Sequence, residues 1–378
     1  MTDFKRLGDI ATYINGYAFK PEDRGNEGLP IIRIQDLTGN SYDLGFYNGE
    51  YSERIEINNG DVLISWSGSL GVYLWNKGKA LLNQHIFKVV FDKAEIDKSY
   101  FIYAIQHYLK EMEAKTHGAT MKHITKKDFD DMLVPYPNMQ KQRETAGILS
   151  MVDGIIVSCQ QELTKLDELV KSRFVEMFGD PMTNPKGYPC YTVGDIIEFQ
   201  GGSQPDKKYF EYVPSKDNIR LIQIRDYKSD KYITYIPRAM AKRFCTADDI
   251  MIGRYGPPIF QILKGIEGSF NVALMKATPK QGNREFIREF LKQDCLLEYL
   301  EGLSQRTAGQ DGIQMDKLKA YPFPYPPIAL QDRFAAFVAE VDKSKFRIQK
   351  SLSTSRKLWT LARIDAIMNM DFSTQRSL

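Results

Sequence analysis

The glycine-rich stretches of the sequence lack the groups that a phosphate-binding loop needs. The nearest candidates, residues 67–71 and 265–268, contain neither the lysine nor the hydroxyl residue that follows it in such a loop. His117 and His123 stand six positions apart, a spacing that does not bring both onto one helical face for metal binding. The 4 cysteines are widely spaced without a C-x-x-C pair, so we expect neither a zinc site nor a disulfide framework.

Two short segments resemble pieces of enzyme motifs but are incomplete. Glu113-Ala114-Lys115 has the form of part of a nuclease site, a pattern that arises often by chance. Residues 83–87 stand where an adenine-methylating tetrapeptide could lie, but paired prolines and a cofactor-binding glycine motif are missing. We therefore expect no catalytic residue, no metal site and no cofactor in this chain, and interpret it as a recognition protein.

The composition is that of a folded protein with about two domains. The chain has 378 residues, of which 43% are hydrophobic and 26% charged, which excludes a disordered chain. The net charge is only +3, so any surface that binds nucleic acid must be local. The charged N-terminus has no apolar core of a secretory signal, and no apolar run is long enough to cross a membrane. We expect a cytoplasmic protein.

The two halves of the sequence repeat one pattern of short motifs. These motifs recur in the same order at offsets between 186 and 190 residues: 7–10 at 193–196, 31–36 at 221–226, 61–64 at 249–252, 135–137 at 324–326, and Gln142 at Gln331. Each match is weak alone, but their common order indicates two copies of one large module.

Each module begins with a region of mixed secondary structure. Short β-rich runs broken by Gly, Asn and Pro predict strands at 29–34, 61–65, 219–224 and 250–252. Helical stretches are predicted near 99–115 and 285–301. An α+β domain fits this pattern best.

Each module ends in a long helix with a coiled-coil pattern. The predicted helices cover about 140–178 and 331–370, and apolar residues recur at a and d heptad positions, with interruptions at Arg173, Lys345 and Ser355. The residues predicted to pair the helices are Leu149, Val152, Ile156, Leu163, Leu166, Val170, Val338, Val341, Ile348, Leu352 and Trp359. The alternative is that each helix packs only on its own domain.

If these helices pair antiparallel, the two α+β domains lie at opposite ends of the pair and are held at a fixed distance from each other. A helix of about 35 residues spans roughly 50 Å, which corresponds to about 15 base pairs of B-DNA. The fold class that we predict is α+β, with two similar domains separated by two long antiparallel coiled-coil helices in a pseudo-twofold internal repeat. If each domain binds one half of a DNA site, the two half-sites should differ in sequence, because the two domains do.

The junction after the first long helix carries a family resemblance. Phe178-Gly179-Asp180-Pro181, followed by Asn184-Pro185-Lys186-Gly187, closely resembles the specificity subunits of type I restriction-modification systems. The repeated 7–10 motif at each domain start, and 135–137 with Gln142 at a helix start, resemble the same family. The resemblance covers essentially the whole chain.

This resemblance implies an organisation and a set of partners. Residues 1–139 would be the first target recognition domain, 140–180 the central spacer helix, 186–328 the second target recognition domain, and 329–371 the C-terminal spacer helix. The chain would bind double-stranded DNA and recruit two modification (methyltransferase) subunits and the restriction (nuclease and translocase) subunits, without contact to a membrane. S-adenosylmethionine, ATP and Mg would be bound by those partners and not by this chain.

The side chains expected to contact DNA lie in loops between strands, at matching places in both copies. Arg, Lys, Asn and Gln suit base edges, and cations and hydroxyls suit phosphates. The candidates are Lys20, Arg24, Arg33, Gln35, Ser65, Ser67, Lys115, Thr116, His117, Thr120, Lys122, His123, Gln204, Lys207, Lys208, Arg220, Gln223, Arg225, Arg254, Tyr255, Gln305, Arg306, Gln310 and Gln314.

Two other functions remain open at this point. The chain could be a self-contained DNA methyltransferase or nuclease, which would need a cofactor loop and a catalytic motif. It could also be a scaffold that uses the coiled coil only for assembly. Binding to duplex DNA would separate the two functions, because phosphate contacts make it steeply dependent on salt, whereas a scaffold would show a flat response.

Overall fold

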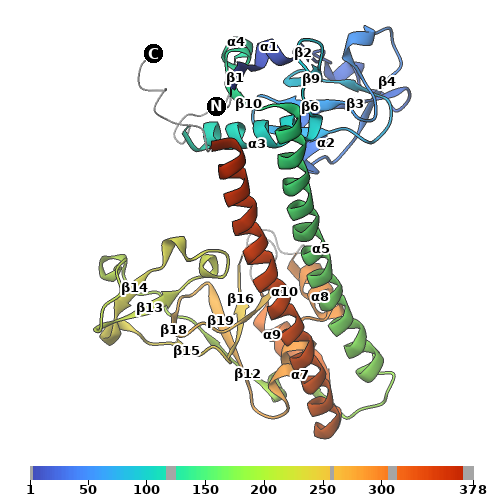
Figure 1. Cartoon of the computed structure of the whole chain (residues 1–378). Coiled ribbons are helices and arrows are strands. Elements are labelled where there is room, and N and C mark those ends of the chain that lie inside the picture. The colour runs from blue at the N-terminus through green and yellow to red at the C-terminus, as the bar shows by residue number, and fades with distance from the viewer. Residues whose placement is uncertain (1–2, 116–124, 256–258, 305–312, 369–378) are drawn as a thin grey trace. The chain divides into compact units, whose positions relative to one another are not determined.

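The computed structural model describes residues 3–115, 125–255, 259–304 and 313–368, and gives the backbone alone at 110–115, 303–304 and 362–368. The chain divides into two compact units, one of residues 1–160 with 350–378 and one of residues 161–349 (Figure 1). Each unit holds one α+β domain and one half of each long helix.

The first domain contains two sheets and a ribbon. Its strands are β1 Asp3–Arg6, β2 Thr12–Asn15, β3 Leu29–Ile32, β4 Gly45–Tyr47, β5 Glu56–Ile57, β6 Val62–Ser65, β7 Gly71–Leu74, β8 Ala80–Leu82, β9 Ile86–Val90 and β10 Leu133–Tyr136. One 4-stranded sheet has the order β2-β9-β6-β7, and the other has the order β4-β3-β8-β5 with β3 parallel to β8. The ribbon pairs β1 with β10, so the first and last strands of the domain lie together.

The second domain repeats this topology. Its strands are β11 Cys190–Thr192, β12 Ile197–Gly201, β13 Asn218–Ile222, β14 Tyr235–Pro237, β15 Phe244–Cys245, β16 Ile250–Gly253, β17 Gln261–Lys264, β18 Gly268–Phe270, β19 Leu274–Pro279 and β20 Pro322–Pro324. The sheet orders are β12-β19-β16-β17 and β14-β13-β18-β15, and the ribbon pairs β11 with β20. Strand for strand this is the order of the first domain, which confirms the internal repeat and the α+β class.

The helices follow the same repeat. In the first module they are α1 Leu7–Ile10, α2 Ile34–Thr38, α3 Lys98–Lys115, α4 Lys126–Asp130 and α5 Met139–Phe178. In the second they are α6 Val193–Ile196, α7 Arg284–Leu291, α8 Asp294–Ser304, α9 Met315–Ala320 and α10 Ile328–Met368. Short 3-10 turns are η1 Pro21–Asp23, η2 Glu53–Ile55, η3 Lys207–Tyr209, η4 Ile224–Tyr227, η5 Asp230–Tyr232 and η6 Arg238–Met240.

Two predicted strands are shorter than the sequence indicated. The strands expected at 29–34 and 219–224 end at Ile32 and Ile222, and a short helical turn begins two residues later in each case. The cause is a capping aspartate. The carboxylate of Asp36 accepts the backbone N–H of Arg33 at 2.7 Å, and Asp226 accepts that of Gln223 at 3.2 Å.

The single helix predicted at 285–301 is two helices. Gln293 lies in the break between α7 and α8, and its side-chain amide donates to the carbonyl oxygen of Glu289 at 2.9 Å. That bond satisfies a carbonyl group at the end of α7, so the chain can turn and begin α8 at Asp294.

The long helices pair antiparallel in the second unit. Phe174 of α5 packs edge-on against Phe334 near the start of α10, with ring centroids 5.5 Å apart. Earlier in α5, Asp167 meets Lys345 farther along α10. Figure 1 shows these halves of α5 (green) and α10 (red) side by side. Antiparallel pairing is thus confirmed here, and α5 ends where Gly179 adopts a left-handed φ of +78°.

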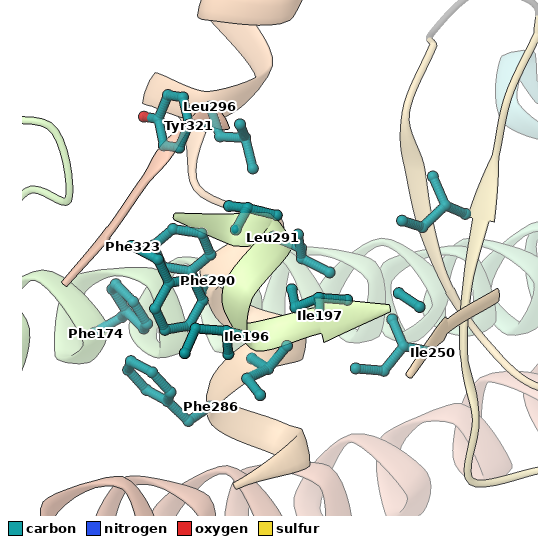
Figure 2. Close-up of a cluster of buried hydrophobic side chains, with 14 of the residues drawn as sticks. Phe174, Ile196, Ile197, Ile250, Phe286, Phe290, Leu291, Leu296, Tyr321 and Phe323 are labelled. Atoms are coloured by element: carbon teal, nitrogen blue, oxygen red, sulfur yellow. The ribbon is translucent and has the colours of Figure 1, made fainter. Parts of the chain in front are cut away.

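An aromatic core joins this helix pair to the second domain. Figure 2 shows Phe174 gathered with Phe286, Phe290 and Phe323 beside Ile196. The rings of Phe174 and Phe286 are stacked at 5.5 Å. Burial of several aromatic side chains in one cluster supplies a large share of a domain's hydrophobic free energy.

Within the described ranges, none of the helices has the length and apolar character needed to cross a bilayer. The same residues include no cluster of three or more His, Cys, Asp or Glu side chains placed to hold a metal ion.

Candidate nucleic-acid interface

The turn after β3 is held by two side chains, Arg33 and Gln35, that the sequence predicted to contact DNA. Arg33 is only 16% exposed at its side chain, and it pairs with Asp36 at 3.3 Å and with Asp43 at 3.4 Å. Its hydrogen bond to Asp43, with the nearby charge of Arg24, holds the pKa of the Asp43 carboxyl below its ordinary value. With its amide oxygen turned towards Arg33, Gln35 accepts from the two terminal guanidinium nitrogens, Nη2 and Nη1, at 2.8 and 3.1 Å. Arg33 and Gln35 therefore shape this loop.

The second domain builds the same turn from different residues. Asp226 replaces Asp36, and the arginine that approaches it is Arg220, with Nε 3.6 Å from the Asp226 carboxylate. Gln223 and Arg225 both donate to the hydroxyl of Thr234, at 3.0 and 3.1 Å. Burial raises the pKa of Asp226, against the opposing effects of the Gln223 N–H and the Arg220 charge. The matched positions of the two copies are thus brought into equivalent turns.

Exposed cations gather at the loops that lead into β3 and β13. Lys20 directly precedes η1 and its side chain is 73% exposed. Lys207 and Lys208 lie in η3, the corresponding turn of the second domain, and the Lys208 side chain is 65% exposed. Lys208 also lies 5.0 Å from the ring centroid of Tyr209. Lys20 lies 4.0 Å from the carboxylate of Glu22, and Lys208 lies 3.5 Å from that of Asp206, so both ammonium groups have an acidic neighbour although they are exposed.

Arg24 and Gln204 lie in the same pair of loops. Arg24 is bound to Asp43 at 2.9 Å, and its side chain is 24% exposed. Gln204 is exposed and donates its amide to the carbonyl oxygen of Pro205 at 3.2 Å.

The residues after the buried strands β6 and β16 differ between the domains. Ser65 is fully buried and its hydroxyl donates to the carbonyl oxygen of Ser69 at 2.6 Å, and Ser67 is 9% exposed. These two serines therefore form the turn rather than a binding surface. In the second domain Arg254 lies 5.3 Å from the ring centroid of Tyr255, which is 48% exposed. This cation–aromatic pair is partly accessible in the second domain, whereas the described residues after β6, 66–70, include no Lys or Arg.

The remaining candidates lie mostly where the structure gives no description. Those outside the described residues are Thr116, His117, Thr120, Lys122, His123, Gln305, Arg306 and Gln310. Lys115 is the last residue of α3 and is described by its backbone. Gln314 is the residue that precedes α9 and is partly buried.

The predicted helix-pairing positions follow the buried side of both helices. Each one is buried or half-buried, while their neighbours along each helix are mostly exposed. The positions are Leu149, Val152, Ile156, Leu163, Leu166 and Val170 on α5, and Val338, Val341, Ile348, Leu352 and Trp359 on α10.

Sequence reasoning missed the aromatic end of this seam. After Val170 the buried positions are Phe174 and Phe178, whereas the heptad count placed Arg173 and Met177 on the seam. The buried residues there are spaced by four, because α5 turns towards Phe286 of its own unit as well as towards α10. The sequence does contain a sign of this change, because Phe174 and Phe178 are two large apolar residues spaced by four.

Comparisons with known proteins agree with this architecture. Residues 2–168 match the family described as type I restriction modification DNA specificity domain. The chain is 29% identical over 168 residues to the EcoBI specificity subunit of Escherichia coli, covering 44% of the chain and 35% of that protein. It is 23% identical over 234 residues to the MjaVIII specificity subunit of Methanocaldococcus jannaschii, covering 61% of the chain and 50% of that protein. The chain thus matches about a third to a half of these relatives' length.

Solved structures extend the likeness of fold, and of fold alone, to nearly the whole chain. The S subunit of a type I restriction-modification system from M. genitalium superposes with a TM-score of 0.57 at 16% identity, covering 98% of this chain and 97% of that one. A second structure, titled for complex assembly and conformational transition of the type I R-M system, gives 0.53 at 14% identity, with 97% of both chains covered. The resemblance to type I specificity subunits inferred from the sequence is confirmed.

Proposed function

We propose that this chain is the specificity subunit of a type I restriction-modification complex. In this role it reads a bipartite, asymmetric DNA site and directs partner subunits to methylate adenine or cleave DNA. The observation that carries the proposal is the duplicated domain. Two domains share one strand order but differ in the residues that shape and line their loops, as Arg33 and Arg220 illustrate. An asymmetric site has two different halves, and two domains of the same fold with different loops can each recognise one of them.

The gap between the two half-sites would be set by the long helices. A rigid helix pair of fixed length would keep the two readers at one separation, about 15 base pairs by the length of the helices. Lys20, Lys207 and Lys208 supply phosphate contacts in this proposal, and the loops beside them supply base contacts.

The modification and restriction subunits would supply the chemistry. In this proposal the partners carry S-adenosylmethionine, ATP and Mg, and the complex acts in the cytoplasm. A surface suited to a protein partner exists on α5, where Ile148, Met151 and Ile155 are 54%, 69% and 42% exposed. Their spacing puts them on one face of the helix, and such an apolar stripe supports contact with another subunit.

The test is methylation mapping of the complete complex. The chain is co-expressed with its modification subunits, and adenine methylation is mapped across the host genome. We expect one motif with two different half-sites and a fixed unspecified gap. The isolated chain is assayed in parallel with S-adenosylmethionine and DNA. Turnover by the chain alone would favour a self-contained methyltransferase, and DNA binding that does not respond to salt would favour a scaffold.

A further inference from the structure

A buried glutamine occupies the same place in both modules, where each domain meets its long helix. Gln142 and Gln331 lie in the first turns of α5 and α10, and both side chains have no exposed surface. A buried amide is costly unless its oxygen and its nitrogen both find partners.

Each of the two amides makes the same pair of hydrogen bonds. The oxygen of Gln142 accepts the backbone N–H of Asp97 at 2.9 Å, and its nitrogen donates to the carbonyl of Pro137 at 2.7 Å. The oxygen of Gln331 accepts the backbone N–H of Asn283 at 2.9 Å, and its nitrogen donates to the carbonyl of Pro326 at 2.8 Å.

The partners of each amide are the starts of two helices. Asp97 precedes α3 and its carboxylate accepts the N–H of Tyr100 at 2.9 Å. Asn283 caps α7, accepting the N–H of Glu285 at 2.9 Å. In each module the glutamine therefore ties the start of the domain helix to the proline that leads into the long helix.

The packing around this tie differs between the modules while the tie stays the same. In the first module the Tyr100 hydroxyl donates to the carbonyl of Pro135 at 3.1 Å. At the equivalent place in the second module Phe286 has no hydroxyl and stacks on Phe174 instead. An apolar residue could fill this part of the core equally well. The presence of the same hydrogen-bonded amide in both modules therefore points to a requirement on the geometry of the junction between domain and long helix.

We infer that Gln142 and Gln331 are positioning residues that fix the direction of each long helix relative to its own domain, and so set the gap length that the subunit accepts. The inference rests on the proposed function. A domain of about 135 residues has a radius of gyration near 14 Å. Rotation by about 15° at the junction would therefore displace its centre by about one base-pair rise. Loss of the tie should broaden gap selection while leaving base reading intact.

The experiment uses the full chain in complex with its modification subunits. Gln142→Met and Gln331→Met remove both hydrogen bonds and nearly keep the side-chain volume. Gln140→Met and Gln349→Met are matched controls, since both residues are exposed on the same two helices. The substrates are plasmids carrying the two mapped half-sites with the native gap, or with the gap shortened or lengthened by one base pair.

We expect the preference for the native gap to fall at least tenfold in both buried-glutamine variants, with unchanged half-site bases and unchanged controls. Equal loss of methylation at every gap length, an unchanged preference, or a change in the bases read would overturn the inference. If the Met variants do not fold, the test uses Gln142→Glu and Gln331→Glu instead. These variants keep the acceptor oxygen and lose the donor N–H, and their gap preference is judged by the same outcomes. A wild-type complex that recognises no gapped site would instead refute the proposed function, and this inference with it.

Discussion

Lys345 of α10 lies 2.6 Å from the carboxylate of Asp167 of α5. In the sequence this lysine interrupts the apolar seam of the second long helix. The structure shows how it is accommodated, because the Lys345 side chain is 17% exposed while that of Asp167 is 69% exposed. The aliphatic stem lies on the seam and the ammonium group reaches the solvent-facing carboxylate.

Replacement of this lysine should stabilise the helix pair. Lys345→Leu fills the seam position with an apolar side chain, and we expect a gain of about 1 kcal/mol in the free energy of unfolding. Thermal unfolding of the full chain measures it. Lys343→Leu is the control, because that side chain is 65% exposed and pairs with Glu340. Equal gains from the two substitutions would show that Lys345 does not occupy the seam.

Phe174 should be among the most costly residues to remove. It is 1% exposed and contacts Phe178, Phe286 and Phe334. We expect Phe174→Ala to lower the free energy of unfolding by about 3–5 kcal/mol. Urea denaturation measures the loss, with Val175→Ala as control because Val175 is 49% exposed. A comparable loss in both variants would contradict the assignment of Phe174 to the core.

The lysines of η3 should contribute to DNA affinity through phosphates. Each phosphate contact adds close to one unit to the slope of log affinity against log salt. We therefore expect Lys207→Gln with Lys208→Gln to reduce that slope by about two for duplex DNA containing the site. Fluorescence anisotropy at several KCl concentrations gives the slope. Lys343→Gln, on the helix pair, should leave it unchanged, and an unchanged slope in the double variant would exclude phosphate contacts here.

Acid should loosen the turn after β3. The pKa of Asp43 is lowered by its hydrogen bond from Arg33 and by the charge of Arg24, so the charged carboxylate is favoured in the folded chain. A lowered pKa contributes stability above the ordinary carboxyl value, near 3.9, and that contribution disappears as pH falls through the lowered pKa. An NMR titration of the Asp43 carboxyl carbon should place its midpoint below the ordinary value in the wild type.

Substitution of Arg33 provides the control for that titration. In Arg33→Gln the midpoint of Asp43 should move up towards the ordinary carboxyl value, since the largest cause of the shift is removed. A midpoint that does not move would mean that the Arg33 hydrogen bond does not form in solution.

Periodicity made the long helices and the repeat predictable. Apolar residues at heptad spacing located both helices to within a few residues, since such patterns depend only on local geometry. The strand ends were not predictable in this way. Asp36 and Asp226 convert the continuation of two strands into helical turns by capping the backbone, and a run of apolar residues carries no sign of that.

The sequence does not show which of the candidate side chains are free to contact DNA, for a physical reason. Residue type shows that Arg33 could read a base, but whether its guanidinium is free depends on Asp36 and on Asp43, ten residues away. Ser65 likewise follows a strand and has a suitable hydroxyl, yet the turn folds back and buries it. Both outcomes depend on tertiary contacts, which the sequence alone does not reveal.

The order of the two long helices along the chain has a consequence for synthesis. α5 ends at Phe178 and α10 begins at Ile328, so about 150 residues are translated between them. At ribosomal speeds this delay is roughly 8 to 30 s. During that interval the apolar side of α5, with Val170, Phe174 and Phe178, is without the helix that will cover it. Until α10 emerges, these three side chains lack one of the surfaces that buries them in the folded chain.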